Sequence, residues 1–118
     1  MIDDELGWRN FFSYALPPKG YDVVVAESGP DAIIKAQKEP FDLVITDIKM
    51  PEMDGVEAFA TIRKIQPSVV VIMMTGHAVE DRVREGLKLK ATTCLRKPFD
   101  LDSMFLTIQQ ALTPTSLN

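Results

Sequence analysis

The chain has 118 residues, of which 46% are apolar and 25% charged, and its formal net charge is −4. This length fits one domain with one core, and the acidic balance argues against direct nucleic-acid binding, which usually needs a basic surface. A single cysteine excludes an internal disulfide and an all-cysteine metal site. No apolar run approaches the ~18 residues of a membrane helix, and no signal peptide is recognisable, so we expect a cytoplasmic protein without membrane contact.

Short apolar runs alternate with amphipathic segments along the chain, and prolines and glycines separate them. The apolar runs predict strands at 1–2, 21–26, about 42–47, 69–74 and 91–95. The helical periodicity predicts helices over 5–16, about 28–40, about 54–65, around 79–87, and from near 100 to about 112. The polar tail from about 113 is expected to fray, so the chain reads as a single domain over 1–118.

This alternation predicts an α/β fold, in which a parallel sheet carries helices on both faces. Right-handed crossovers favour a doubly wound sheet, and the flavodoxin-like order 2-1-3-4-5 is the usual solution for five strands. The first strand, Met1-Ile2, is shortened. Because this order makes it internal, its neighbours keep unpaired backbone groups. Two explanations stay open: the start is misassigned or trimmed, or the domain borrows a strand from another copy.

Polar residues follow four of the five predicted strands. They are Asp3-Asp4, Asp47, Thr75 and Lys97. Since the carboxyl ends of parallel strands meet at one edge of the sheet, where ligands bind in open α/β folds, we expect these side chains to converge.

The chemistry of this set is that of phosphoryl transfer onto a carboxylate. Neighbouring carboxylates stay ionised only if positive charge offsets their repulsion, and their oxygens suit Mg²⁺, which prefers one or two carboxylates together with water and phosphate oxygens. Lys97 supplies a movable positive charge, and the Thr75 hydroxyl can donate a hydrogen bond to a phosphoryl oxygen. Asp47 is the candidate nucleophile.

Four segments make the sequence similar to the receiver domains of two-component response regulators, and the similarity covers nearly the whole chain. They are Asp3-Asp4-Glu5, Asp47 within TDIKMPEMDG, Thr75-Gly76 within VVVIMMTGH, and Lys97-Pro98-Phe99. The MP-x-MDG and KPF segments are specific when they occur together at this separation. Taken singly, each residue has an ordinary structural role, such as a helix cap for Asp47 or a surface lysine for Lys97.

The resemblance implies a role for each site residue. Asp47 accepts a phosphoryl group from a phosphohistidine on a sensor histidine kinase or phosphotransfer protein, and the domain catalyses only its own phosphorylation and dephosphorylation. Asp4, Asp47 and the backbone carbonyl of Lys49 bind Mg²⁺, with Asp3 acting through water. Thr75 and Lys97 bind the phosphoryl group, and the Lys97-Pro98 peptide is cis, although most X–Pro bonds are trans. A changed output face then acts on a domain outside this chain or on a second copy.

Two departures from the family pattern keep an alternative open. Cys94 occupies the place of the aromatic residue that reports phosphorylation in the family, and Lys90 stands where a glycine is usual. Together with the short first strand, the cysteine favours a phosphorylation-independent interaction or dimerisation module, whereas the intact acidic set opposes it. A haloacid-dehalogenase-like phosphatase needs a second aspartate two residues after the nucleophile, and that position is Lys49.

Overall fold

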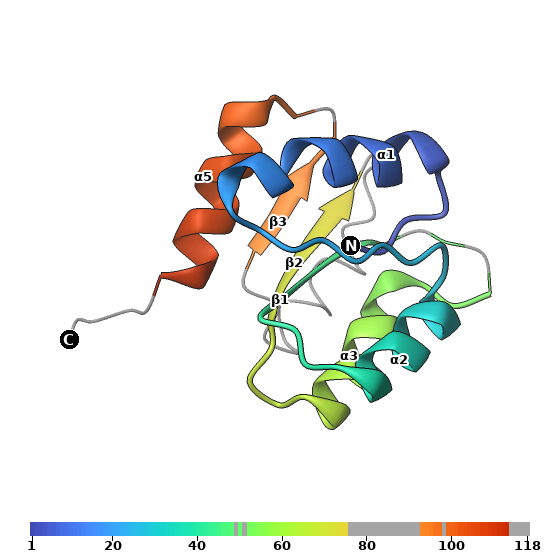
Figure 1. The fold of residues 1–118 in the computed structure, drawn as a ribbon. Coiled ribbons are helices and arrows are strands. Elements are labelled where there is room, and N and C mark those ends of the chain that lie inside the picture. The colour runs from blue at the N-terminus through green and yellow to red at the C-terminus, as the bar shows by residue number, and fades with distance from the viewer. Residues whose placement is uncertain (49, 51, 76–92, 98, 114–118) are drawn as a thin grey trace.

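The computed structural model describes residues 1–48, 50, 52–75, 93–97 and 99–113, which are coloured in Figure 1. Its sheet contains three parallel strands in the order β1-β2-β3. They are β1 (Leu43–Asp47), β2 (Val70–Thr75) and β3 (Thr93–Arg96). In the register, Asp47 pairs with Met74, and Thr75 pairs with Arg96. The α/β class and the neighbouring order of the last three predicted strands are therefore confirmed.

The predicted strand at 21–26 is wrong as a continuous element, and the five-strand order 2-1-3-4-5 is not confirmed. Ile2 instead forms two isolated parallel bridges, one to Ala26 and one to Thr46. These bridges place Ile2 between the two segments, as the predicted order requires for its first strand. The physical reason is the short first strand: Met1 and Ile2 supply too few backbone partners to extend a ladder along 21–25.

The described α-helices agree with the predicted ones to within a few residues. They are α1 (Leu6–Ala15), α2 (Gly29–Lys38), α3 (Gly55–Ile65) and α5 (Leu101–Leu112). The 3₁₀ turn η1 (Pro17–Lys19), which follows α1, was not predicted. Side-chain oxygens of Ser28, Asp54 and Asp100 accept a backbone N–H in the first turns of α2, α3 and α5. Such caps stabilise a helix by about 1 kcal/mol each. The predicted helix around 79–87 and the tail beyond 113 lie outside the described residues.

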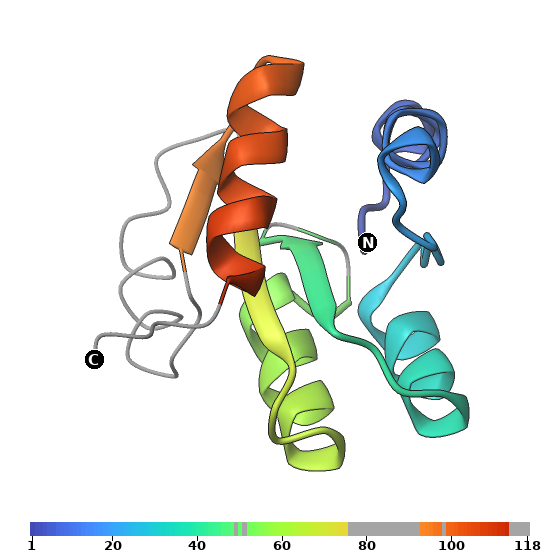
Figure 2. The ribbon, with the colours of Figure 1, turned by 60° about the vertical axis from the view of Figure 1, so that its left-hand side comes forward.

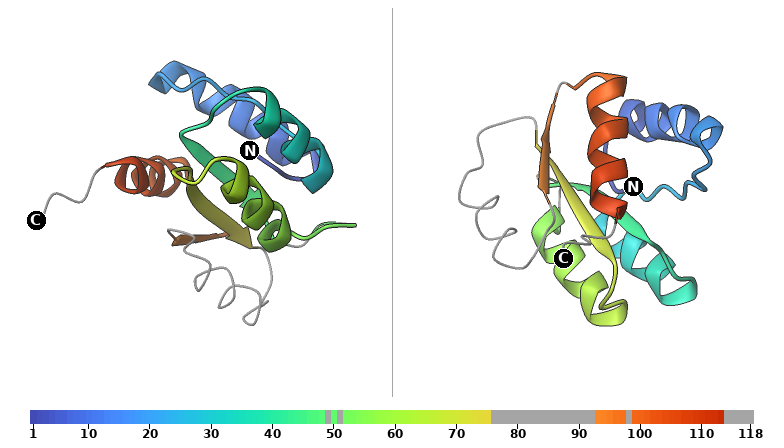
Figure 3. Two further views of the ribbon diagram at one scale, coloured as in Figure 1. Left: turned by 90° about the horizontal axis from the view of Figure 1, so that it is seen from below. Right: turned by 90° about the vertical axis from the view of Figure 1, so that its left-hand side faces the viewer.

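The helices that the structure describes lie on both faces of the sheet. Among them, α1 and α5 cover one face, and α2 and α3 cover the other (Figures 1 and 2). Successive strand residues point to opposite faces, so Val44 and Val71 pack toward α2 and α3, whereas Ile45 and Ile72 pack toward α1 and α5. Figure 3 shows the same arrangement from below and from the side. None of the described helices is long and apolar enough to span a bilayer.

Candidate functional site

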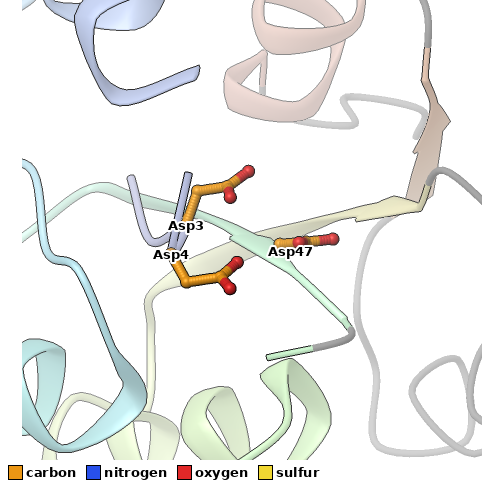
Figure 4. A group of neighbouring side chains, drawn as sticks. All are labelled: Asp3, Asp4 and Asp47. Atoms are coloured by element: carbon orange, nitrogen blue, oxygen red, sulfur yellow. The ribbon is translucent and has the colours of Figure 1, made fainter. Parts of the chain in front are cut away.

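Three carboxylates meet at the carboxyl end of β1. Asp47 is the last residue of β1, and the bridge between Ile2 and Thr46 brings Asp3 and Asp4 beside it. One carboxylate oxygen from each residue lies within 4.8 Å of the others, and Figure 4 shows the three groups directed to the same side. Asp3 and Asp47 are buried, whereas Asp4 is exposed. The predicted convergence of these residues is thus present.

Asp3 is held by groups from the start of α1. Its Oδ1 accepts the backbone N–H of Glu5 at 2.9 Å, and its carbonyl oxygen accepts a hydrogen bond from Arg9 Nη1 at 2.9 Å. A fully buried carboxylate without partners would be costly to desolvate. These bonds fix the turn between Ile2 and α1, and therefore the position of the acidic pair.

Lys97 places its ammonium among the carboxylates. Its Nζ lies 2.8 Å from Asp3 Oδ2 and 3.7 Å from Asp47 Oδ2, and its side chain is 9% exposed. The backbone N–H of Lys97 donates to the Thr75 carbonyl at 2.7 Å, which anchors the residue to the end of β2. The same Nζ lies 4.8 Å from the centroid of the Trp8 ring, within the range of a cation–π contact.

Burial raises the pKa of Asp47 to about 6, because an ionised carboxylate loses hydration there. The Lys97 ammonium opposes this rise, while the carboxylates of Asp3 and Asp4 add to it, and the backbone N–H of Ile48 lowers the pKa slightly. Asp47 therefore has two neighbouring carboxylates and one neighbouring ammonium. A further cation at this place would favour its ionised form.

The loop after β1 returns to start α3 directly against Asp47. Gly55, the first residue of α3, donates its N–H to the Ile48 carbonyl at 2.7 Å. A Cβ at Gly55 would overlap the backbone oxygen of Asp47, so only glycine allows this approach. The glycine of the MDG segment thereby has a structural role in placing Asp47.

The structure places Thr75 at the end of β2, where its side chain is buried. Lys49, predicted to offer its carbonyl to a metal, and Pro98, predicted to follow a cis bond, lie outside the described residues. Sequence reasoning missed Trp8 and Arg9 as neighbours of the site. Their spacing of four and five residues after Asp4 is the signal that could have found them, since it places both on the first turns of α1, next to the acidic pair.

This arrangement defines an α/β protein with an oxygen-rich, negatively charged site at the carboxyl edge of its sheet, into which Lys97 places its ammonium. The sequence model of the response regulator receiver domain matches residues 1–109. The chain therefore belongs to the response regulator receiver domains.

Curated relatives carry the same domain within longer proteins. The transcriptional regulatory protein ZraR of Klebsiella oxytoca is 37% identical over 118 residues, which is 100% of this chain and 27% of that protein. The transcriptional regulatory protein GlrR of Escherichia coli (strain K12) is 37% identical over 112 residues, which is 95% of this chain and 25% of that protein. The chain thus spans about a quarter of the length of these relatives.

Solved structures agree with the fold. The chemotaxis protein CheY4 of Vibrio cholerae superposes with a TM-score of 0.87 at 34% identity, covering 94% of both chains. A response regulator from Burkholderia pseudomallei superposes with a TM-score of 0.83 at 25% identity, covering 97% of this chain and 65% of that one. The latter structure contains a phosphorylated aspartic acid, a calcium ion and citrate.

Proposed function

We propose that this domain is a phosphorylation switch in which Asp47 accepts a phosphoryl group from the phosphohistidine of a sensor histidine kinase or phosphotransfer protein. The observation that carries the proposal is the position of Asp47, with Lys97 at 3.7 Å and two further carboxylates beside it. A carboxylate oxygen attacks phosphorus, a P–O bond forms, and the P–N bond breaks. The imidazole leaves with the electron pair and regains a proton.

The residues present fit a divalent cation. Their donors are hard carboxylate oxygens gathered within 4.8 Å, the set that Mg²⁺ prefers. Asp4 and Asp47 would hold the ion, with Asp3 close by and the Lys49 carbonyl as the family expectation. When bound, Mg²⁺ would neutralise the carboxylates and the phosphoryl oxygens. A calcium ion accompanies the phosphorylated aspartic acid in the Burkholderia structure, which supports this assignment.

Lys97 and Thr75 would bind the phosphoryl group. Lys97 Nζ sits nearer Asp3 than Asp47, so a short movement of its flexible side chain would pair it with the added phosphate. Thr75 lies at the end of the neighbouring strand, where its hydroxyl can donate to a phosphoryl oxygen. Positioning and charge neutralisation supply most of the catalysis in such transfers. The domain would then dephosphorylate when water attacks phosphorus, and it would turn over no metabolite.

The output of the switch is proposed from the relatives. ZraR and GlrR are transcriptional regulatory proteins about four times as long as the matched segment, so an output domain that acts on transcription in the cytoplasm fits this receiver. A phosphorylation-independent interaction module remains the second candidate. It is favoured by Cys94, which packs against the core at the position of the expected aromatic switch residue.

Hydroxylamine trapping tests the acceptor. The protein is treated with acetyl phosphate and Mg²⁺, and then with neutral hydroxylamine, which attacks the acyl carbon, releases inorganic phosphate and leaves a hydroxamate. Peptide mapping is expected to place that hydroxamate on Asp47 alone. A hydroxamate on another aspartate would overturn the assignment of the acceptor. Its absence from a folded, Mg²⁺-binding protein would favour the second candidate.

A further inference from the structure

The Lys97 ammonium has two neighbours near the start of α1 and one at the end of β1. Its Nζ lies 2.8 Å from Asp3 Oδ2, 4.8 Å from the centroid of the Trp8 ring and 3.7 Å from Asp47 Oδ2. Asp3 shortly precedes α1, and Trp8 lies in the first turn of this helix. The ammonium is therefore shared between the α1 side of the site and the proposed phosphoryl acceptor.

Asp3 is fixed relative to the first turn of α1. It is fully buried, its Oδ1 accepts the Glu5 N–H at 2.9 Å, and its carbonyl oxygen accepts a hydrogen bond from Arg9 Nη1 at 2.9 Å. Arg9 directly follows Trp8, and its N–H donates to the Glu5 carbonyl at 3.2 Å. Asp3 and Trp8 are consequently tied to the same turn of backbone.

Aromatic contacts hold the Trp8 ring in place. Its centroid lies 4.9 Å from that of Phe99, with the planes 34° apart, and 5.7 Å from that of Phe11, with the planes 84° apart. The Phe99 ring also lies 6.1 Å from the ring of Phe12, which is fully buried. These separations and angles are typical of attractive ring pairs. The Trp8 ring is thus a fixed surface beside the ammonium.

The backbone of Lys97 is held on both sides. Its N–H donates to the Thr75 carbonyl at 2.7 Å, and Phe99, two residues later, packs among the rings of α1. The lysine side chain between these anchors is a flexible four-carbon stem. A change in the partners of the ammonium therefore requires movement of the side chain alone.

The Trp8 contact favours the resting position of the ammonium. The Lys97 side chain is 9% exposed, and a cation–π contact strengthens as the cation loses hydration, with tryptophan the most favourable ring. A phosphoryl group on Asp47 would draw the ammonium from the α1 side towards its own oxygens. An interaction that is stronger in the ground state than in the transition state raises the barrier to reaction, so the ring would slow the transfer.

We propose that Trp8 is a positioning residue that retains the Lys97 ammonium on the Asp3 side of the site and thereby slows phosphorylation of Asp47. This inference rests on the proposed function, because it assigns a control to the same phosphoryl site. Trp8 acts here through the positive charge of Lys97. Its effect therefore depends on the electron density of the ring as well as on its shape.

Ring fluorination tests this dependence, and it changes Trp8 alone because Trp8 is the single tryptophan of the sequence. Monofluoro- and trifluorotryptophan withdraw electron density from the ring face while nearly keeping its shape. The rate constant of phosphorylation by acetyl phosphate and Mg²⁺, followed by intact mass, should rise with each step, to at least about threefold for the trifluoro ring. Trp8→Leu should be at least as fast, and Trp8→Phe should lie between it and the wild type.

Lys97→Met is the control for action through the ammonium. Its slow residual phosphorylation should not depend on fluorination, because the ring then has no cation to retain. Urea unfolding without a phosphodonor tests the contact itself. Fluorination should lower the urea midpoint of the wild type relative to that of Lys97→Met.

The outcomes separate this proposal from the function on which it rests. A wild type that is phosphorylated at a rate that fluorination leaves unchanged or lowers would overturn the role of Trp8 alone. The same acceleration in Lys97→Met would also overturn it, because the ring would then act by another route. A folded wild type that gains no phosphoryl group would overturn the proposed function, and this proposal with it.

Discussion

Lys97 Nζ lies 2.8 Å from Asp3 Oδ2 and 3.7 Å from Asp47 Oδ2, so the lysine pairs more closely with Asp3 than with Asp47. Asp3 is fully buried, and the Lys97 ammonium is its ion-pair partner there. The lysine therefore has a structural partner in Asp3, and under the proposed function it would also bind the phosphoryl group during transfer.

The first prediction separates these two roles. Lys97→Met should destabilise the fold by about 3 kcal/mol, because it leaves the Asp3 carboxylate buried without its cation, and it should strongly slow phosphorylation by acetyl phosphate. Urea unfolding and intact mass measure the two effects. Lys38→Met, at an exposed position, is the matched control and should change neither. If Lys97→Met unfolded at the same urea concentration as the wild type, the ion pair between Lys97 and Asp3 would contribute nothing to the free energy of unfolding.

The second prediction concerns pH. The pKa of Asp47 is raised to about 6 in the folded state from about 3.9 in the unfolded chain. Between these values the folded state binds more protons, so stability should fall as pH rises from about 4 to about 6 and stay lower above that. The shift corresponds to at most about 3 kcal/mol.

Asp47→Asn tests this by removing the titration. The variant should be more stable than the wild type at pH 7, should match it near pH 4, and should show a flatter profile of urea midpoint against pH. Added Mg²⁺ should reduce the difference at pH 7 by stabilising the ionised wild-type site. Parallel profiles for the two proteins would contradict the raised pKa.

The third prediction concerns the glycine beside the acceptor. Gly55→Ala should destabilise the fold and lower phosphorylation, because its Cβ would overlap the Asp47 carbonyl and push the end of β1 or the start of α3 aside. Gly7→Ala is the control: it lies on α1 with open space around it, so it should stabilise the protein by about 0.5–1 kcal/mol. If Gly55→Ala and Gly7→Ala had equal effects on thermal unfolding, the close approach of Gly55 to Asp47 would not be required.

The fourth prediction uses Trp8, the single tryptophan of the sequence. Its ring lies under the Lys97 ammonium and beside the Phe99 ring, with centroids 4.9 Å apart. If Lys97 moves toward a phosphoryl group on Asp47, the fluorescence of Trp8 should change when beryllofluoride and Mg²⁺ are added. Lys97→Met and Asp47→Asn should lose the response. If Lys97→Met kept the full change in fluorescence, that change would not arise from movement of Lys97.

The site was largely predictable from sequence because its residues follow strands. β1 and β2 are runs of β-branched and apolar residues, and parallel strands end at one edge, so Asp47 and Thr75 had to be neighbours. Which carboxylate Lys97 pairs with was harder to predict from the sequence. That Lys97 prefers Asp3 depends on how the turn at Asp3 is tied to Glu5 and Arg9, which no periodicity encodes.

The segment 21–26 shows where local pattern reasoning fails. Its valines favour a strand, yet a strand also needs a neighbour along its length, and Met1 and Ile2 reach only Val24 and Ala26. A shortened strand was visible in the sequence, but the residues with which Met1 and Ile2 pair, Val24, Ala26 and Thr46, required the structure.

The most direct test of the account is the intact mass of the protein after incubation with acetyl phosphate, with and without Mg²⁺. The wild type and the exposed-site control Asp42→Asn should each gain one phosphoryl group only when Mg²⁺ is present, and Asp47→Asn should gain none. Addition to Asp47→Asn at the wild-type rate, or no addition to a folded wild type, would contradict the assignment of Asp47 as the phosphoryl acceptor.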